Sequence, residues 1–206
     1  MTDLAAHWEN VYATKDPAAV SWYRPHLERS LAFVEAAGLA PGAHVIDVGG
    51  GASTLVDDLV ARGLSVTVLD LSPTALARSR ERLGPRAETV RFVAADVLTS
   101  GISQGSVDLW HDRAVLHFLR DDADRARYRA RLLDALAPRG HVVLGGFAPD
   151  GPEKCSGLPV CRASADDLMA FLGEPFEELG RAAEVHVTPW SSTQSFAYVH
   201  ARRRGA

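Results

Sequence analysis

Residues 44–51 read His-Val-Ile-Asp-Val-Gly-Gly-Gly, an apolar run that passes directly into three glycines. A short run of branched apolar residues bounded by glycines is typical of a buried strand that enters a tight turn. Glycines at positions 49 and 51 let the backbone approach a ligand closely, because they carry no Cβ. The stretch therefore predicts the first strand of a parallel sheet and a ligand-binding turn at its end.

Beyond this stretch, short apolar runs alternate with helical patterns, which is typical of βα units and a mostly parallel sheet. The expected strands are residues 65–70, 89–94, 106–110 and 141–147, and the expected helices between and after them are residues 55–62, 72–83, 124–137 and 164–172. Strand-like runs at 184–188 and 194–201 flank a turn-like segment and predict an antiparallel hairpin. We expect an α/β fold with a Rossmann-like, mostly parallel sheet, this C-terminal hairpin, and helices on both faces.

The chain's 206 residues suit one domain with a substantial core, so we expect a single domain over residues 1–206. Helical patterns at 4–13 and 27–37 predict an N-terminal helical lid segment over residues 1–40. The Rossmann-like core then occupies residues 41–206. Hydrophobic residues at 47% and charged residues at 23% are ordinary for a folded globular protein.

Charge and composition also bear on partners and compartment. The net charge of −4 gives no general attraction to nucleic acid or to anionic lipid, so we expect neither partner. No secretory signal is recognisable, and no apolar stretch approaches the roughly 20 residues that span a bilayer. The two cysteines suit a reducing compartment. These features predict a cytoplasmic protein, and the arginines at 202–204 are expected to form a solvated tail.

Three aspartates stand at the expected ends of the first three strands, namely Asp47, Asp70 and Asp96. In an open α/β sheet these ends meet at one edge, where ligands bind. Asp70 follows Asp47 by 23 residues, close to the roughly 20-residue spacing at which a carboxylate meets ribose hydroxyls. Asp96 can accept a hydrogen bond from an adenine amino group, with Val97 adding a backbone or apolar contact. Each residue alone is compatible with an ordinary turn, but the ordered set favours a nucleoside cofactor.

A nicotinamide dinucleotide is one candidate for that cofactor. Its G-x-G-x-x-G fingerprint requires a third glycine at position 54, where this chain has Thr54. The departure disfavours the dinucleotide.

Residues 45–53, together with Asp70 and Asp96 at the ends of the next two expected strands, resemble the corresponding motifs of the class I S-adenosylmethionine-dependent methyltransferases. The resemblance covers about residues 40–200. It implies a seven-stranded sheet with a reversed final strand, and S-adenosylmethionine as the cofactor. Ser53 stands where many members of the family have a third motif glycine.

The same resemblance implies a role for each matching residue. The turn of Gly49, Gly50 and Gly51 is expected to contact the methionine part of the cofactor. Asp70 is expected to contact the ribose and Leu71 an adenine face. Asp96 and Val97 are expected at the adenine edge.

The N-terminal segment carries a second similarity. Residues 7–12 and 20–23 look similar to the start of small bacterial methyltransferases of the thiopurine and tellurite type, which act on small molecules or metalloids. Trp22 and Tyr23 are expected to form a lid over the cofactor's sulfonium, because an aromatic face attracts a cation. Core packing between helices is the alternative for this aromatic pair.

The candidates for contact with the methyl acceptor follow the fourth strand, in a segment that resembles the Asp-Arg-Gly-Ala-Leu stretch of thiopurine-type methyltransferases. His111 or Asp112 is expected to orient or deprotonate the acceptor, and His117 to project toward it. Arg113, in the same segment, is a candidate for substrate binding. The alternative is that Asp112 caps the following helix and that His117 packs in the core.

Cys155 and Cys161 lie in a loop rich in glycine and proline after the fifth strand. Two thiols there suit capture of a soft acceptor such as a metalloid, and Cys155 alone is a candidate substrate contact. Their spacing matches no zinc pattern, so no resident metal is predicted. Ordinary loop or core cysteines are the alternative.

The leading functional hypothesis is transfer of a methyl group from S-adenosylmethionine to a small-molecule acceptor by in-line displacement. The short chain and its acidic net charge favour a small acceptor. A protein-lysine methyltransferase and a non-catalytic, cofactor-binding regulatory domain are the alternatives.

Overall fold

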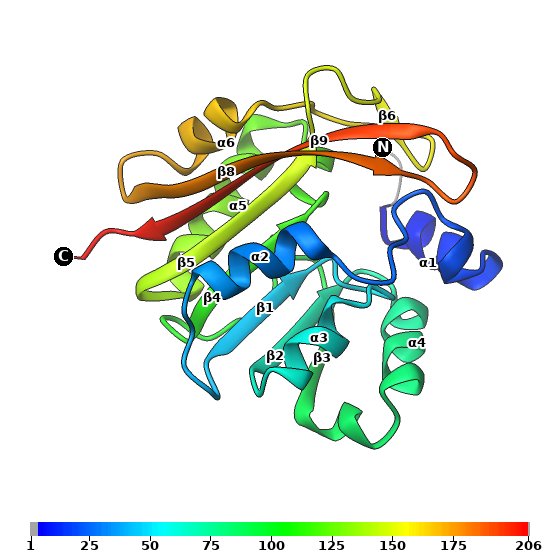
Figure 1. The fold of residues 1–206 in the computed structure, drawn as a ribbon, viewed down its shortest axis with the longest axis horizontal. Helices are drawn as coiled ribbons and strands as arrows, with labels where there is room; N and C mark the ends of the chain where they lie inside the picture. Colours follow the sequence, from blue (N-terminus) through cyan, green and yellow to red (C-terminus); the bar gives the residue numbers. More distant parts are fainter. Residues whose placement is uncertain (1–3, 206) are drawn as a thin grey trace.

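A seven-stranded sheet, in the order β3-β2-β1-β4-β5-β9-β8, forms the framework of a computed structural model that describes residues 4–205 (Figure 1). Its strands are β1 (His44–Val48), β2 (Ser65–Asp70), β3 (Val90–Ala94), β4 (Val107–Arg113), β5 (Leu136–Phe147), β8 (Phe176–Val187) and β9 (Thr193–Arg203). The first five run parallel, whereas β9 is antiparallel to both β5 and β8. The predicted fold class is therefore confirmed, including the reversed strand.

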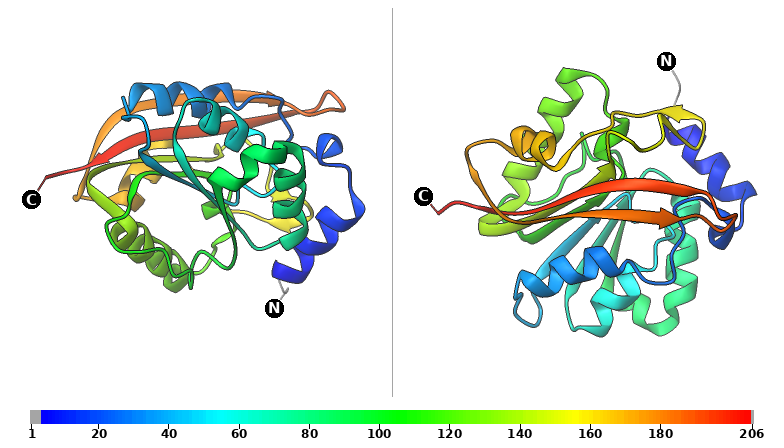
Figure 2. Two further views of the ribbon diagram at one scale, coloured as in Figure 1. Left: turned by 90° about the horizontal axis from the view of Figure 1, so that it is seen from below. Right: turned by 45° about the horizontal axis from the view of Figure 1, so that its top comes forward.

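Helices cover both faces of the sheet, as predicted (Figure 2). The α-helices are α1 (Leu4–Thr14), α2 (Glu28–Ala36), α3 (Leu55–Ala61), α4 (Pro73–Leu83), α5 (Asp122–Ala135) and α6 (Ala165–Leu172). Short 3₁₀ helices are η1 (Pro17–Ala19), η2 (Gly84–Thr89) and η3 (Leu116–Phe118), and a small hairpin joins β6 (Lys154–Cys155) to β7 (Leu158–Pro159). Within residues 4–205, no helix is both long and apolar enough to cross a bilayer.

The sheet is buried on both sides, which explains the continuous apolar run in β1. Val45 and Ile46 point to opposite faces, and both are fully buried. Val45 packs in the cluster formed with α2, α3 and α4, whereas Ile46 packs in the cluster formed with α5 and α6. The central strand is thus held rigidly between two apolar layers.

Strand β4 is longer than predicted. Its expected end was Trp110, but it continues to Arg113. His111 pairs with Asp47 of β1 in the register, and Arg113 pairs with Gly145 of β5. Neighbouring strands on both sides satisfy the backbone of these polar residues, so the strand continues where local polarity indicated a loop.

The C-terminal hairpin was also underestimated. Strand β8 begins at Phe176 rather than Glu184, and β9 reaches Arg203. The solvated tail predicted for residues 202–204 is wrong, because Arg202 binds Glu177 at 2.6 Å and Arg203 Nη1 donates to the carbonyl oxygens of Leu133 and Leu136. The first half of β8 lies at the sheet edge and buries few side chains, so its hydrophobic periodicity is weak.

Strand β5 begins at Leu136, before the expected break at residues 138–140. Leu136 pairs with Val107, but the register then jumps, so that His141 pairs with Leu109. The intervening residues bulge out, with Arg139 at a φ of 62°. The proline and glycine interrupt the pairing, as expected, without ending the strand.

Candidate functional site

A cavity of about 210 Å³ lies at the carboxyl ends of β1, β2 and β4, where the strand order reverses. Ligands of open α/β sheets bind at this position. The cavity is lined by six of the predicted cofactor-binding residues, namely Trp22, Gly49, Asp70, Leu71, Asp96 and Val97. Residues up to 75 positions apart in the sequence thus meet at one edge of the sheet.

Gly49, in the turn after β1, lines the cavity, whereas Gly51 does not. Gly49 and Gly51 have φ values of 68° and 39°, in the left-handed region that favours glycine. A Cβ on Gly49 would overlap the side chain of Val115, and one on Gly51 would lie 2.7 Å from an Asp70 carboxylate oxygen. Glycine is therefore required here both by the backbone conformation and by the available space.

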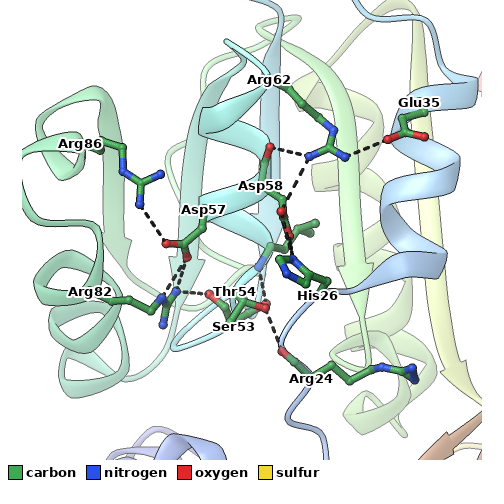
Figure 3. Close-up of polar contacts among 11 residues, drawn as sticks. Arg24, His26, Glu35, Ser53, Thr54, Asp57, Asp58, Arg62, Arg82 and Arg86 are labelled. Carbon is green, nitrogen blue, oxygen red and sulfur yellow. Dashed lines mark hydrogen bonds and ion pairs between the residues drawn. The ribbon is translucent and has the colours of Figure 1, made fainter.

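The turn is held from outside by side chains of α3 and α4 (Figure 3). Arg82 donates to the carbonyl oxygen of Ser53 and pairs with Asp57 at 2.8 Å. The hydroxyl of Thr54 donates to the carbonyl oxygen of Arg24 at 2.9 Å. Thr54, which stands where a dinucleotide fingerprint has glycine, thus ties the N-terminal segment to the turn.

Two of the predicted carboxylates, one buried and one exposed, line the cavity together with Asp124 of α5. Asp70 ends β2, is 8% exposed, and accepts a hydrogen bond from Ser72 N at 2.8 Å. Burial raises the pKa of Asp70 to about 7. Asp96 is exposed and accepts from Leu98 N at 2.8 Å. The cavity therefore offers one hydrogen-bond acceptor at a buried position, on Asp70, and one at an exposed position, on Asp96.

A second cavity, of about 60 Å³, adjoins the first and shares Gly49 and Arg113 with it. Asp47, Gly50 and Tyr23 border this second cavity, rather than the first. Asp47 Oδ1 lies 2.7 Å from His111 Nδ1, whereas Asp47 Oδ2 is buried with no partner among the described residues. A Cβ on Gly50 would overlap that free oxygen. The turn and Asp47 thus leave a small space with one unsatisfied acceptor.

His111 and Asp112, two of the predicted catalytic residues, are each only 1% exposed. His111 bridges Asp47 and the hydroxyl of Ser30, which lies 2.8 Å from Nε2. Neither residue lines the larger cavity. His111 therefore joins β4 to β1 and α2.

Asp112 caps the 3₁₀ helix η3. Its Oδ1 accepts from Val115 N at 2.8 Å, and its Oδ2 accepts from Leu116 N at 3.0 Å and from the hydroxyl of Tyr128 at 2.5 Å. Trp110 Nε1 donates to the same Tyr128 hydroxyl at 2.9 Å. The structure therefore matches the capping alternative, and gives the catalytic prediction for Asp112 no geometric basis.

His117 is buried between aromatic rings. Its ring centroid lies 4.3 Å from that of Phe118 and 5.0 Å from that of Phe147. Neither ring nitrogen has a partner among residues 4–205, and burial lowers the pKa of His117 to about 3. This is the packing alternative, because the imidazole does not reach the cavity.

Arg113 and Cys155, the two predicted substrate contacts, both line the larger cavity. Cys155 is a buried free cysteine, and burial raises the pKa of its thiol to about 12. The thiol is therefore neutral at physiological pH. No three His, Cys, Asp or Glu side chains of the described chain are grouped so as to hold a metal ion.

An aromatic cluster over the cavity was largely missed by sequence reasoning. Trp8 of α1 lies with its ring centroid 5.6 Å from Trp22 and 5.3 Å from Phe118. Phe147 and Phe196 extend the lining from β5 and β9. These rings come from separate elements, so no spacing in the sequence connects them.

Helix α1 is fixed above the cavity by a carboxylate. Glu9 accepts hydrogen bonds from the hydroxyl of Ser72 at 2.6 Å and from Thr74 N at 3.2 Å, and also from the Thr74 hydroxyl. These donors lie at the start of α4, where a negative charge also interacts favourably with the helix dipole. Glu9 thereby holds Trp8 and Tyr12 against the cavity.

Comparison with known proteins agrees with this architecture. Residues 46–142 match a family model described as a methyltransferase domain. The chain is 33% identical to Nodulation protein S of Rhizobium tropici over 141 residues, and 28% identical to that of Sinorhizobium fredii strain NBRC 101917 / NGR234 over 141 residues. Each match covers 68% of this chain, and the chain spans 57% and 62% of those two relatives.

Solved structures share the fold. The N-methyltransferase NodS from Bradyrhizobium japonicum WM9, in complex with S-adenosylhomocysteine, superposes with a TM-score of 0.73 at 20% identity and covers 98% of this chain and 99% of its own. A Burkholderia thailandensis 1,6-didemethyltoxoflavin-N1-methyltransferase gives 0.74 at 23% identity, over 98% of this chain and 87% of its own. At these identities the likeness concerns the fold.

Proposed function

We propose that this chain, whose fold is that of the class I S-adenosylmethionine-dependent methyltransferases, binds S-adenosylmethionine and transfers its methyl group to a small molecule. One observation carries the proposal: Gly49 of the glycine turn, Asp70 and the Asp96–Val97 pair converge on a single cavity at the strand-order reversal. A nucleoside offers hydroxyls and an amino group that match these acceptors.

The residues present fit the parts of this cofactor. Asp70 would accept hydrogen bonds from the ribose hydroxyls, and Leu71, Asp96 and Val97 would surround the adenine. The unpartnered Asp47 Oδ2 beside Gly50 suits an ammonium group such as that of the methionine part. The two adjoining cavities would thus hold the two halves of the molecule.

When bound, S-adenosylmethionine supplies an electrophilic methyl group. The chain's part is to align the acceptor with that group and to exclude water. Trp8, Tyr12 and Trp22 line the cavity with rings whose faces attract a sulfonium. Neither His111 nor Asp112 lines the larger cavity, although His111 borders the second one, so the proposal needs no general base from either.

The cavity favours a small acceptor over a lysine side chain of a protein. Its far end is surrounded by Phe118, Phe147, Cys155 and Phe196, and α1 lies over it. An aromatic, covered cavity suits a compact molecule, whereas a protein substrate needs an open groove. The class of methyl acceptor that this chain uses is therefore proposed from its own cavity.

Titration calorimetry with S-adenosylhomocysteine tests the cofactor assignment. We expect measurable binding, and an affinity about 10- to 100-fold lower in Asp70→Ala, because a charged hydrogen-bond acceptor is worth about 1.5–3 kcal/mol. The matched control is Asp134→Ala, at an exposed site on α5. Equal affinities in both variants would contradict the assignment.

Methyl transfer is tested with cofactor labelled in its methyl group and a panel of amines, thiols and hydroxyl compounds. Label in a small product supports the proposal. Label only in added proteins would favour the lysine methyltransferase alternative, and cofactor binding without transfer to anything would favour the regulatory one.

A further inference from the structure

Arg113 reaches across the sheet into the acceptor end of the cavity. Arg113, Gly145 and Tyr198 occupy one row of the register across β4, β5 and β9. A Cβ on Gly145 would overlap the Tyr198 ring. Because position 145 has no side chain, Arg113 Nε donates to the Tyr198 hydroxyl at 3.0 Å, and the guanidinium lies 4.6 Å from the Phe196 ring centroid.

The guanidinium has a donor left over. Nη1 donates to the carbonyl oxygen of Trp22 at 3.3 Å, but Nη2 is buried and has no partner among residues 4–205. Arg113 lines the cavity that also contains Phe147, Cys155 and Phe196. A buried donor of a cation without an acceptor is costly, so the site is incomplete as it stands.

The surrounding charges do not neutralise Arg113. The nearby carboxylate, Glu184, accepts from the Tyr198 hydroxyl at 2.7 Å and pairs with Arg24 at 2.6 Å. No carboxylate oxygen of the described chain lies within ion-pair distance of Arg113. His117 and Cys155 are kept uncharged by burial. Arg24 is thus shared between Glu184 and Glu28, which lies 3.5 Å away, whereas Arg113 has no carboxylate partner among the described residues.

We infer that the methyl acceptor carries an anionic group and that Arg113 binds this group through Nη2. The aromatic walls select a flat, largely apolar body for the rest of the acceptor. A carboxylate is the simplest such anion, because a guanidinium matches its geometry. This inference rests on the proposed function, whose acceptor class it narrows.

The carboxylate of the cofactor's own methionine is the other source of the same chemistry. Arg113 lines both cavities, so its position is compatible with either carboxylate. Its contacts with Phe196 and Tyr198 of β9 lie on the acceptor side. An experiment can separate the two sources.

Benzoate and benzamide, which differ mainly in charge, are suitable probes for calorimetry on the complex with S-adenosylhomocysteine. We expect benzoate to bind at least about tenfold more tightly than benzamide, as for a charge-assisted hydrogen bond. The preference should vanish in Arg113→Gln and be partly retained in Arg113→Lys, which keeps the charge. Arg91→Gln, at an exposed position on the edge strand β3, is the matched control and should behave as the unmodified protein.

Equal affinities for the two probes in the unmodified protein, or a benzoate preference that survives in Arg113→Gln, would overturn the inference. So would a loss of affinity in Arg113→Gln for S-adenosylhomocysteine but not for 5′-methylthioadenosine, which lacks the carboxylate. Melting curves of both Arg113 variants establish that they fold. Repeating the benzoate titration without cofactor separates this claim from the proposed function: an Arg113-dependent preference supports the anion site even if S-adenosylhomocysteine does not bind.

Discussion

Asp70 and Asp112 are both buried carboxylates at the same edge of the sheet, but their surroundings give them different capacities. Both oxygens of Asp112 accept hydrogen bonds from the chain itself, from η3 and from Tyr128. Asp70 accepts from Ser72 N and lines the cavity, with one oxygen beside Gly51. Asp112 is therefore positioned to hold the structure, whereas Asp70 is available to a ligand.

Asp70→Asn is expected to stabilise the ligand-free protein while weakening cofactor binding. The pKa of Asp70 is raised to about 7 by burial, so the unfolded chain ionises first. The folded state therefore loses stability as the pH rises from about 4 through 7. Asparagine does not ionise and so removes this loss. In chemical denaturation, the increase in unfolding free energy over the unmodified protein should be about 2 kcal/mol larger at pH 8 than at pH 5.

The same measurement on Asp134→Asn, at the exposed site on α5, provides the control and should show no such pH dependence. A gain in unfolding free energy that is independent of pH would show that Asp70 is already ionised at pH 5 in the folded protein, and so would contradict the raised pKa.

Asp112→Asn is expected to destabilise the protein without a specific effect on methyl transfer. Its amide nitrogen would face backbone or hydroxyl donors, which costs about 1–3 kcal/mol of unfolding free energy. Tyr128→Phe should cost a similar amount, because it removes a donor to Asp112 and also leaves the buried Trp110 Nε1 without its acceptor. Rates measured well below the melting temperature should stay within about twofold, whereas a hundredfold loss in folded Asp112→Asn would restore the predicted catalytic role.

At the scale of elements, side chains from distant segments place the short pieces around the cavity. Asp112 determines where η3 begins, Glu9 determines where α1 docks, and Arg82 holds the glycine turn. Short helices have little intrinsic stability, so tertiary contacts of this kind decide their position.

Glu9→Gln is expected to loosen α1 from α4. The hydrogen bonds from Ser72 and Thr74 lower the pKa of Glu9, so its contribution is present above the ordinary carboxyl pKa and is lost as the pH falls through the lowered one. We expect affinity for S-adenosylhomocysteine to fall about three- to tenfold, with faster hydrogen exchange in residues 4–14. Glu88→Gln, at an exposed position in η2, should change neither quantity. Unaltered exchange in α1 would show that Glu9 does not hold it.

At the scale of the whole molecule, the cavity is assembled from both ends of the described chain. Helix α1 and the segment with Trp22 lie over the cavity. The antiparallel strand β9, which neighbours β5, brings Phe196 to the far end of the cavity. Ligand binding should therefore stabilise segments that are far apart in the sequence.

S-adenosylhomocysteine at about 100 times its dissociation constant is expected to raise the unfolding free energy by about 2.7 kcal/mol. Thermal denaturation at increasing ligand concentration measures this effect. Hydrogen exchange should show protection in the glycine turn, α1 and η3 together, because all three border the cavity. Protection confined to one of them would contradict a shared site.

The sequence by itself determined the order of the elements, the parallel core and the residues at the strand ends. These features follow from local signals: apolar runs, the glycine turn, and Ser72 with Pro73, which start α4 as expected. Gly49, Asp70, Asp96 and Val97 could be predicted as cofactor contacts from the sequence because strand ends in a parallel sheet meet at one edge, and all four line the larger cavity.

Only the tertiary structure decided which polar residues of β4 are free. His111, Asp112 and Arg113 are consecutive, but the alternation of a strand sends Asp112 to the opposite face from the other two, and only Arg113 reaches the larger cavity. The unpaired donor of Arg113 depends on contacts with β9 and the Trp22 segment, 85 and 91 residues away. Such contacts depend on how strands and loops pack in space, which no local pattern encodes.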